Sequence, residues 1–164
     1  MPSTPRPGAL AIHDEELQLL VESCLSPSPT ARPSAATVDG AGNVYVGDTL
    51  NNTIRKISPT GQVSTLAGLA GQLGTNDGTG SAARFNFPVG VAVDTAGNVY
   101  VADSKNFTIR KITPLGVVTT VAGTPGTADT VDGDRNTARL NFPEHLVLDA
   151  SGNIYVVEYA AVRK

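Results

Sequence analysis

The stretch that decides the fold of this chain is residues 89–103, VGVAVDTAGNVYVAD. An apolar run leads into a short Thr-Ala-Gly segment, and a second run rich in valine follows it. β-Branched and aromatic residues favour strands, while glycine permits the backbone conformations that tight turns need. The stretch therefore predicts a β-hairpin.

Near-copies of this hairpin occur upstream, at residues 36–48, and downstream, at residues 146–158. The aspartates that close their first strands are spaced by 55 residues each time, which is the signature of a repeat architecture. We expect a structural role for the positions that recur with this period, namely Asp39, Gly42, Asn43, Asp94, Gly97, Asn98, Asp149, Gly152 and Asn153.

Two further strands complete each unit. In the middle unit, residues 108–113 alternate apolar and polar side chains, a Pro-Leu-Gly turn follows, and residues 118–123 form the fourth strand. Short turns join all four strands, so each unit is an antiparallel meander. Repeated four-stranded meanders predict an all-β fold of β-propeller blades, with the first strand of each unit nearest the axis. A β-solenoid is the alternative, but its coils are shorter than this period and need no hairpin turns.

The chain divides into two parts. Residues 1–33 are rich in proline and predict a flexible N-terminal extension, with a short helix over residues 14–25. The blades follow over residues 34–164, at about 34–68, 89–123 and 144–164, joined by long loops. The third unit ends inside its third strand.

Composition excludes some classes of function. The net charge of −3 and the lack of interleaved basic and aromatic residues disfavour nucleic-acid binding. No apolar run approaches the ~18 residues of a membrane span. Cys24 is the single cysteine, so it forms no internal disulfide and the compartment stays open.

The repeats resemble the NHL-repeat family. The matching residues are 87–94 and 97–103, then Asn106 and the Ile-Arg-Lys of 109–111. A long-loop variant is indicated by two motifs that recur between units: Asp77-Gly78 with Ala83-Arg84-Phe85-Asn86, and Asp132-Gly133 with Ala138-Arg139-Leu140-Asn141. The resemblance covers about residues 34–164 and implies a propeller, commonly six-bladed, that binds protein, nucleic acid or small ligands. Related six-bladed propellers include lactonases and a peptide-amidating lyase, which are metal enzymes.

Two blades and part of a third do not close a ring. An open arc leaves strand edges and apolar faces uncovered. We therefore expect the chain to be a fragment of a longer protein, or its copies to assemble into a ring.

Candidate site residues lie on one face, which also holds the loops 69–87 and 124–142. Asp48, Asp103 and Glu158 occupy matching positions there. They could hold a divalent cation, but their recurrence in every unit favours bonding to the turns that follow them. Glu144 and His145 break the repeat at the start of an inner strand, where a histidine could ligate a metal, act as a base or make a structural hydrogen bond.

Other charged residues favour structural roles. Asp77-Gly78 and Asp132-Gly133 lack the spacing of a calcium loop and predict turns held by aspartate. The Arg-Lys pair of residues 110–111 is expected on a solvated strand, with its two side chains on opposite sides.

These observations favour a non-catalytic scaffold that presents the long-loop face to a protein or small ligand, without a catalytic residue, metal site or cofactor. A first alternative is a fragment of a metal-dependent six-bladed-propeller lactonase or lyase, with a divalent cation near Glu144, His145 and Glu158. A second alternative is a self-assembling partial propeller that forms a discrete homo-oligomer.

Overall fold

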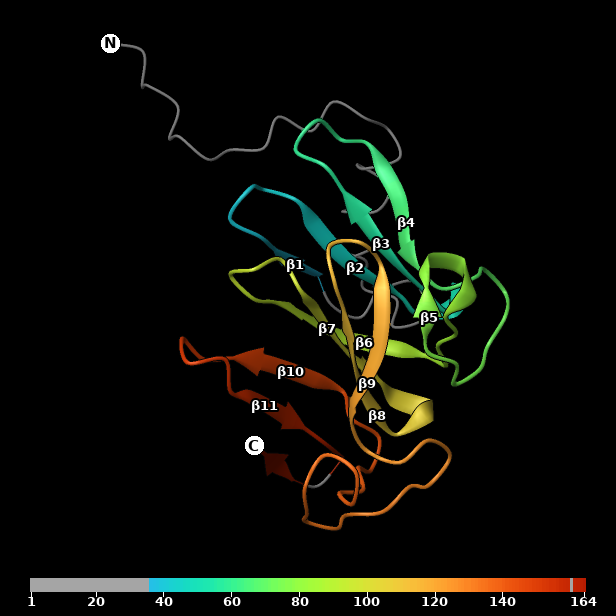
Figure 1. Ribbon diagram of the computed structural model, residues 1–164, viewed down its shortest axis with the longest axis vertical. Coiled ribbons are helices and arrows are strands. Elements are labelled where there is room, and N and C mark those ends of the chain that lie inside the picture. Colours follow the sequence, from blue (N-terminus) through green and yellow to red (C-terminus); the bar gives the residue numbers. More distant parts are fainter. Residues whose placement is uncertain (1–35, 160) are drawn as a thin grey trace, which may run out of the picture.

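The computed structural model describes residues 36–159 and 161–164, which form three antiparallel sheets (Figure 1). The first sheet consists of β1 (Ala36–Val38), β2 (Val44–Asp48), β3 (Thr53–Ile57) and β4 (Val63–Ala67). The second consists of β6 (Pro88–Val93), β7 (Val99–Asp103), β8 (Thr108–Ile112) and β9 (Val117–Ala122), with β5 (Gly78–Thr79) at its edge. The third consists of β10 (His145–Leu148), β11 (Ile154–Val157) and β12 (Val162–Arg163). The predicted all-β class and antiparallel meanders are confirmed, whereas the expected helix over residues 14–25 lies outside the described residues.

The three sheets stack face to face as consecutive blades, seen as three layers from top to bottom in Figure 1. Strand β6 packs against β1 and β2 on one side and against β10 on the other. The first strand of the middle blade is therefore enclosed by its neighbours, as its apolar sequence predicts. Three 3-10 helices, η1 (Thr49–Asn51), η2 (Gly80–Ala82) and η3 (Ser104–Asn106), lie in the connections. No helix among the described residues has the length and apolarity to cross a membrane.

Strand β5 was not predicted. It belongs to the long loop before the middle blade and pairs antiparallel with β9, with Gly78 opposite Val118 and Thr79 opposite Val117. Two residues are too few for a sequence period to reveal a strand. Their pairing covers part of the outer edge of the middle blade, which would otherwise present unpaired backbone groups.

The core lies between the blades and repeats with the sequence. Ile54, Phe85 and Val101 are buried between the first and second blades. Ile109, Leu140 and Val156, each 55 residues further on, are buried between the second and third. Because the same positions fill both interfaces, the sequence period is a period of inter-blade packing.

Strand β8 differs from its predicted exposure. We expected one side of residues 108–113 to face water, but four of the five residues of β8 are buried and Lys111 is half-buried. The reason is that the preceding loop crosses this blade: Asn76 and Asp77 both bind the side chain of Arg110.

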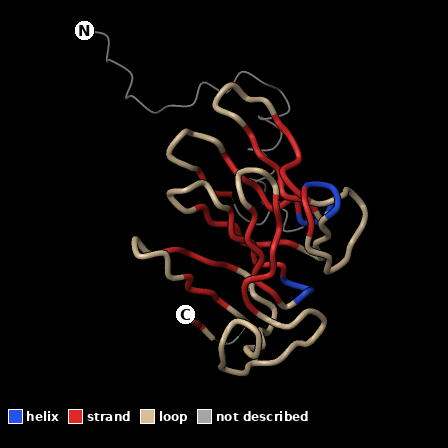
Figure 2. The backbone as a smooth tube through the Cα atoms, viewed as in Figure 1, coloured by secondary structure: helices blue, strands red, loops and turns tan. Residues whose placement is uncertain are grey.

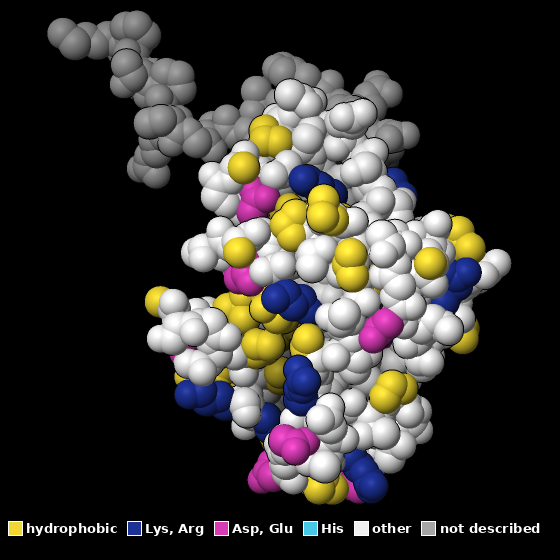
Figure 3. All heavy atoms as spheres, viewed as in Figure 1, with side chains coloured by type: hydrophobic (Ala, Val, Ile, Leu, Met, Phe, Trp, Pro, Cys, Tyr) yellow, Lys and Arg dark blue, Asp and Glu magenta, His cyan; other side chains and the backbone are white. Residues whose placement is uncertain are grey.

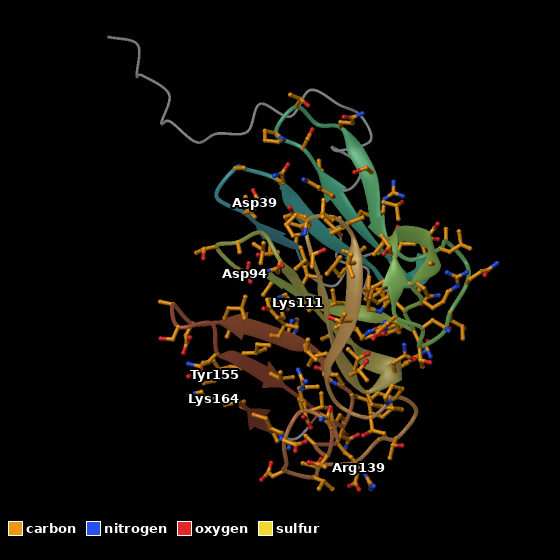
Figure 4. The ribbon with its side chains drawn as sticks, viewed as in Figure 1. Asp39, Asp94, Lys111, Arg139, Tyr155 and Lys164 are labelled. Atoms are coloured by element: carbon orange, nitrogen blue, oxygen red, sulfur yellow. The ribbon has the colours of Figure 1, made fainter. Side chains whose placement is uncertain are left out.

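Each hairpin between first and second strands is held by its aspartate. In the middle blade, Asp94 Oδ1 accepts the backbone N–H groups of Ala96 and Asn98, and Asp94 Oδ2 accepts the amide of Asn98 and the hydroxyl of Tyr100. Gly97 adopts a φ of 80°, which glycine tolerates best. Asp39 and Asp149 make the same four bonds. Asp39 and Asp94 lie at the same end of neighbouring blades in Figure 4.

These bonds favour the ionised carboxylates. Burial works to raise the pKa of Asp94, but the hydrogen bonds from Asn98 and Ala96 outweigh it, so the pKa is lowered. Hydrogen bonds from Asn153 lower the pKa of Asp149. The tyrosine of each hairpin also lies beneath a lysine, with 5.7 Å from the Lys111 Nζ to the centre of the Tyr100 ring. Every blade thus repeats one network at this end.

The hairpin aspartates predict a dependence of stability on pH. A carboxyl group whose pKa is lower in the folded chain stabilises the fold above its unfolded pKa of about 3.9, and this stabilisation is lost as pH falls through the lower folded pKa. Urea denaturation of the Asp94→Asn variant should therefore give a shallower loss of unfolding free energy between about pH 5 and pH 2 than the wild type. Asp129→Asn, at an exposed aspartate whose side chain lies 3.5 Å from Arg139, is the control. Equal slopes for wild type and Asp94→Asn would contradict the prediction.

Gly90 is predicted to be required where two inner strands approach. A Cβ atom at this position would lie 2.5 Å from the carbonyl oxygen of Glu144 and 2.9 Å from the Cα of His145, both backbone atoms of the third blade. Gly90→Ala should therefore lower the free energy of unfolding by about 1–3 kcal/mol in urea denaturation. Gly40→Ala, where the added Cβ meets nothing within 4 Å, should have little effect. A loss of equal size in both variants would show that the close approach does not matter.

Candidate functional site

The long loops lie at the opposite end of the blades from the aspartate hairpins. Figure 2 shows short helices and extended loops on one side and the narrow hairpin turns on the other. We call the surface formed by residues 69–87 and 124–142, together with η1 and η3, the long-loop face. Arg139 lies on it, well separated from Asp39 and Asp94 in Figure 4.

Arg110 fastens the first long loop to the middle blade. Its Nη1 donates to Asp103 Oδ2 at 2.8 Å and to the carbonyl oxygen of Arg84 at 2.9 Å. Its Nη2 donates to Asp77 Oδ1 at 2.6 Å and to the carbonyl oxygen of Asn76 at 3.0 Å. The side chain is 1% exposed. One guanidinium thus binds strand and loop together through charge-assisted bonds in a water-poor setting.

The same clamp recurs in the third blade. Arg163 Nη1 donates to the carbonyl oxygen of Arg139, and Arg163 Nη2 donates to the carbonyl oxygen of Val131 and to Asp132 Oδ1, each at 2.7 Å. Glu158 Oε1 lies 3.5 Å from Arg163 Nη1, in the place of Asp103. All these partners follow the 55-residue period, while the arginine comes two residues early because the third unit is shorter at this point.

The clamp corrects the expectation for Arg110. We predicted a solvated strand for residues 110–111, and Arg110 is instead buried beside Asp103 and the ring of Phe85, whose centre is 5.1 Å from the guanidinium carbon. The alternation of the strand was visible in the sequence. The loop that covers its polar side was not, because the two segments lie more than 20 residues apart.

The three predicted acids of the long-loop face have different surroundings. Asp103 is fully buried; burial raises its pKa to about 6, against hydrogen bonds from the backbone N–H of Asn86 and the side chains of Asn106 and Arg110. Glu158 is also buried and accepts the backbone N–H of Asn141. Asp48 is half-buried and accepts the side-chain amide of the nearby Asn51, with both distances 3.0 Å. Two of these carboxylates therefore bind the chain's own loops.

Glu144 and His145 lie at the start of β10, where both are exposed. The backbone N–H of Glu144 donates to the carbonyl oxygen of Val157, which continues the pairing of β10 with β11. Across residues 36–159 and 161–164, no three or more His, Cys, Asp or Glu side chains gather closely enough to hold a metal ion.

A row of phenylalanines on the long-loop face was missed from the sequence. Phe87, Phe107 and Phe142 have φ values of 60°, 60° and 48°. Such values are sparsely populated for bulky residues and mark places where the surroundings impose the conformation. Phe107 and Phe142 pack edge to face, with ring centres 4.9 Å apart, across the junction of the second and third blades. At the preceding junction, Asn52 replaces Phe107 and accepts the backbone N–H of Phe87.

The row is partly open to solvent. Phe142 is 42% exposed, and Lys105 Nζ lies 4.4 Å from the centre of the Phe87 ring. Leu50 and Leu73, which are also exposed, add apolar surface on the same face. Recurrence of Phe-Pro at residues 87–88 and 142–143 is the sequence signal that could have identified this row.

The stacked meanders, enclosed inner strands and clustered long loops define a set of β-propeller blades. A family model described as NHL repeat matches residues 85–112, and the chain belongs to the NHL-repeat family. NHL repeat-containing protein 2 of Gallus gallus is 41% identical over 106 residues, which is 63% of this chain and 14% of that protein.

Two further comparisons agree with this assignment. The chloroplastic protein SUPPRESSOR OF QUENCHING 1 of Arabidopsis thaliana is 32% identical over 70% of this chain and 12% of its own. The crystal structure of an auxiliary nutrient binding protein from Bacteroides thetaiotaomicron matches with a TM-score of 0.65 and 27% identity, over 74% of this chain and 33% of that one. The chain therefore spans a small part of the length of these relatives.

The clamp yields a prediction about the loop before the middle blade. Arg110→Lys keeps the charge but loses the planar fork that binds four acceptors, so it should lower the free energy of unfolding by about 3 kcal/mol. Amide hydrogen exchange should also accelerate in residues 76–86. Arg55→Lys is the matched control, because Arg55 is the equivalent arginine of the first blade and its guanidinium donates to the exposed Thr65 hydroxyl. Unchanged exchange in residues 76–86 would contradict the role of the clamp.

Proposed function

We propose that this chain is part of a non-catalytic recognition scaffold whose long-loop face binds a protein or a small ligand. The observation that carries the proposal is the repeated arginine clamp. Arg110 and Arg163 each bind two loop carbonyl oxygens and one loop carboxylate. Loops held in this way lose little conformational entropy when a ligand binds, which improves affinity.

The chemistry of the face supports recognition. Two of the acids on this side, Asp103 and Glu158, are buried in the clamps. What the face presents to solvent is aromatic and aliphatic surface, including Phe142 and Leu73, beside the cation of Lys105. Aromatic side chains flanked by polar groups are typical of interaction surfaces.

A relative in solved structures supports the small-ligand form of the proposal. The matched protein from Bacteroides thetaiotaomicron is described as an auxiliary nutrient binding protein. Because the chain spans a third of that protein, the blades outside this chain would contribute to a complete site.

The proposal is tested by comparing two faces of the same molecule. A panel of sugars, amino acids and nucleotides is screened by thermal shift, and protein partners are captured on immobilised chain in parallel. A ligand at 100 times its Kd should stabilise the fold by about 2.7 kcal/mol. Phe142→Ser, on the long-loop face, should abolish this shift or the capture. Leu115→Ser, at an 85% exposed leucine in the turn between β8 and β9, should leave both unchanged.

Two outcomes would overturn the proposal. Binding that depends on Leu115 and not on Phe142 would place recognition on the wrong face. A stoichiometric divalent metal in the purified protein, found by inductively coupled plasma mass spectrometry and lost in His145→Ala, would instead favour the metal-dependent alternative.

A further inference from the structure

A groove runs between the second and third blades, on the side away from the inner strands. It has a volume of about 530 Å³ and is lined by Ile109, Ala122, Leu140, Ile154 and Val156, with Arg163 at its border. Figure 3 shows hydrophobic side chains gathered between the middle and lower blades.

The first interface shows what belongs in such a groove. The residues that match its lining, among them Ile54, Phe85 and Val101, pack there against Ile112 of β8 and Val118 of β9. Both of these side chains are at most 1% exposed. Among the described residues of the third blade, none occupies the corresponding place, because β12 has two residues and no fourth strand follows it.

The edge beside the groove is open. Strand β12 pairs with β11 on one side, with Val162 opposite Val157 and Arg163 opposite Val156. In the middle blade, the equivalent strand β8 also pairs with β9 on its other side. Val162 is 70% exposed. This edge offers backbone groups and an apolar surface together, which is what an added strand binds.

A carboxylate marks the sequence that would fit. In the middle blade, Asp77 Oδ2 accepts the backbone N–H of Thr120 and Asp77 Oδ1 accepts its hydroxyl. The equivalent Asp132 binds Arg163 through Oδ1, and its side chain is 98% exposed. Asp132 is therefore placed to receive a threonine from a strand lying along β12.

We propose that this groove is a strand-acceptor site that binds an extended segment with the sequence of β9. The segment adds to β12 as a fourth strand, inserts a valine between the blades where Val118 lies at the first interface, and donates a threonine N–H and hydroxyl to Asp132. The site lies outside the long-loop face and does not rest on the proposed function.

The test uses the full 164-residue chain and a fluorescent peptide with the sequence of residues 112–124, ITPLGVVTTVAGT. Fluorescence anisotropy should show saturable binding with one peptide per chain. Changing the threonine that matches Thr120 to valine, or making Asp132→Asn in the chain, should each weaken binding about tenfold, the usual effect of losing a hydrogen bond to a charged group. Asp129→Asn removes a charge from the same loop outside the groove and should leave the affinity unchanged.

A second chain makes the test independent of these variants. Residues 112–123 are repeated directly after Lys164, which continues the repeat in register because Lys164 corresponds to Lys111. This extended chain should melt at a higher temperature and lose peptide binding. No binding to the original chain, equal binding of a scrambled peptide, equal losses in Asp129→Asn and Asp132→Asn, or undiminished binding to the extended chain would each overturn the proposal.

Discussion

Each blade carries apolar side chains on both faces of its sheet, and a single sheet can bury neither face alone. This constraint governs the rest of the structure. Ile54, Phe85 and Val101 are buried because the second blade stacks on the first, and Ile109, Leu140 and Val156 because the third stacks on the second. Burial of apolar area is the dominant favourable term in folding, so the interfaces between blades, and not the blades themselves, are the units of stability.

The two ends of the blades solve different problems with the same chemistry. At the hairpin end, a carboxylate such as Asp94 binds groups within seven residues of itself, so the turn is determined locally. At the other end, Arg110 binds acceptors up to 34 residues away and joins a loop to a finished sheet. Local bonds shape each repeat, whereas the arginine clamp fixes how the connection between repeats crosses the blade.

This difference explains how much could be predicted from the sequence. The hairpins were predictable because Asp, Gly and Asn recur at short spacing beside alternating valines. The clamp was not, because nothing near Arg110 in the sequence distinguishes a buried arginine from a solvated one. The prediction for Asp103 as a candidate ligand suffered from the same gap: its position on the long-loop face followed from topology, but its partners Asn86 and Arg110 follow from the path of the loop. The phenylalanine row was hidden because the positive φ values of Phe107 and Phe142 follow from their mutual packing.

The clamp also connects the long-loop face with the open edge. In the middle blade, Asp77 binds Arg110 and Thr120 at once, so the loop, the third strand and the fourth strand share one carboxylate. In the third blade, Asp132 binds Arg163 on one side and faces solvent on the other. A strand that joins β12 would bind this carboxylate and so restrain residues 131–141, the loop that leads to Phe142. Completing the blade and ordering the recognition face are therefore one structural event, because the same aspartate takes part in both.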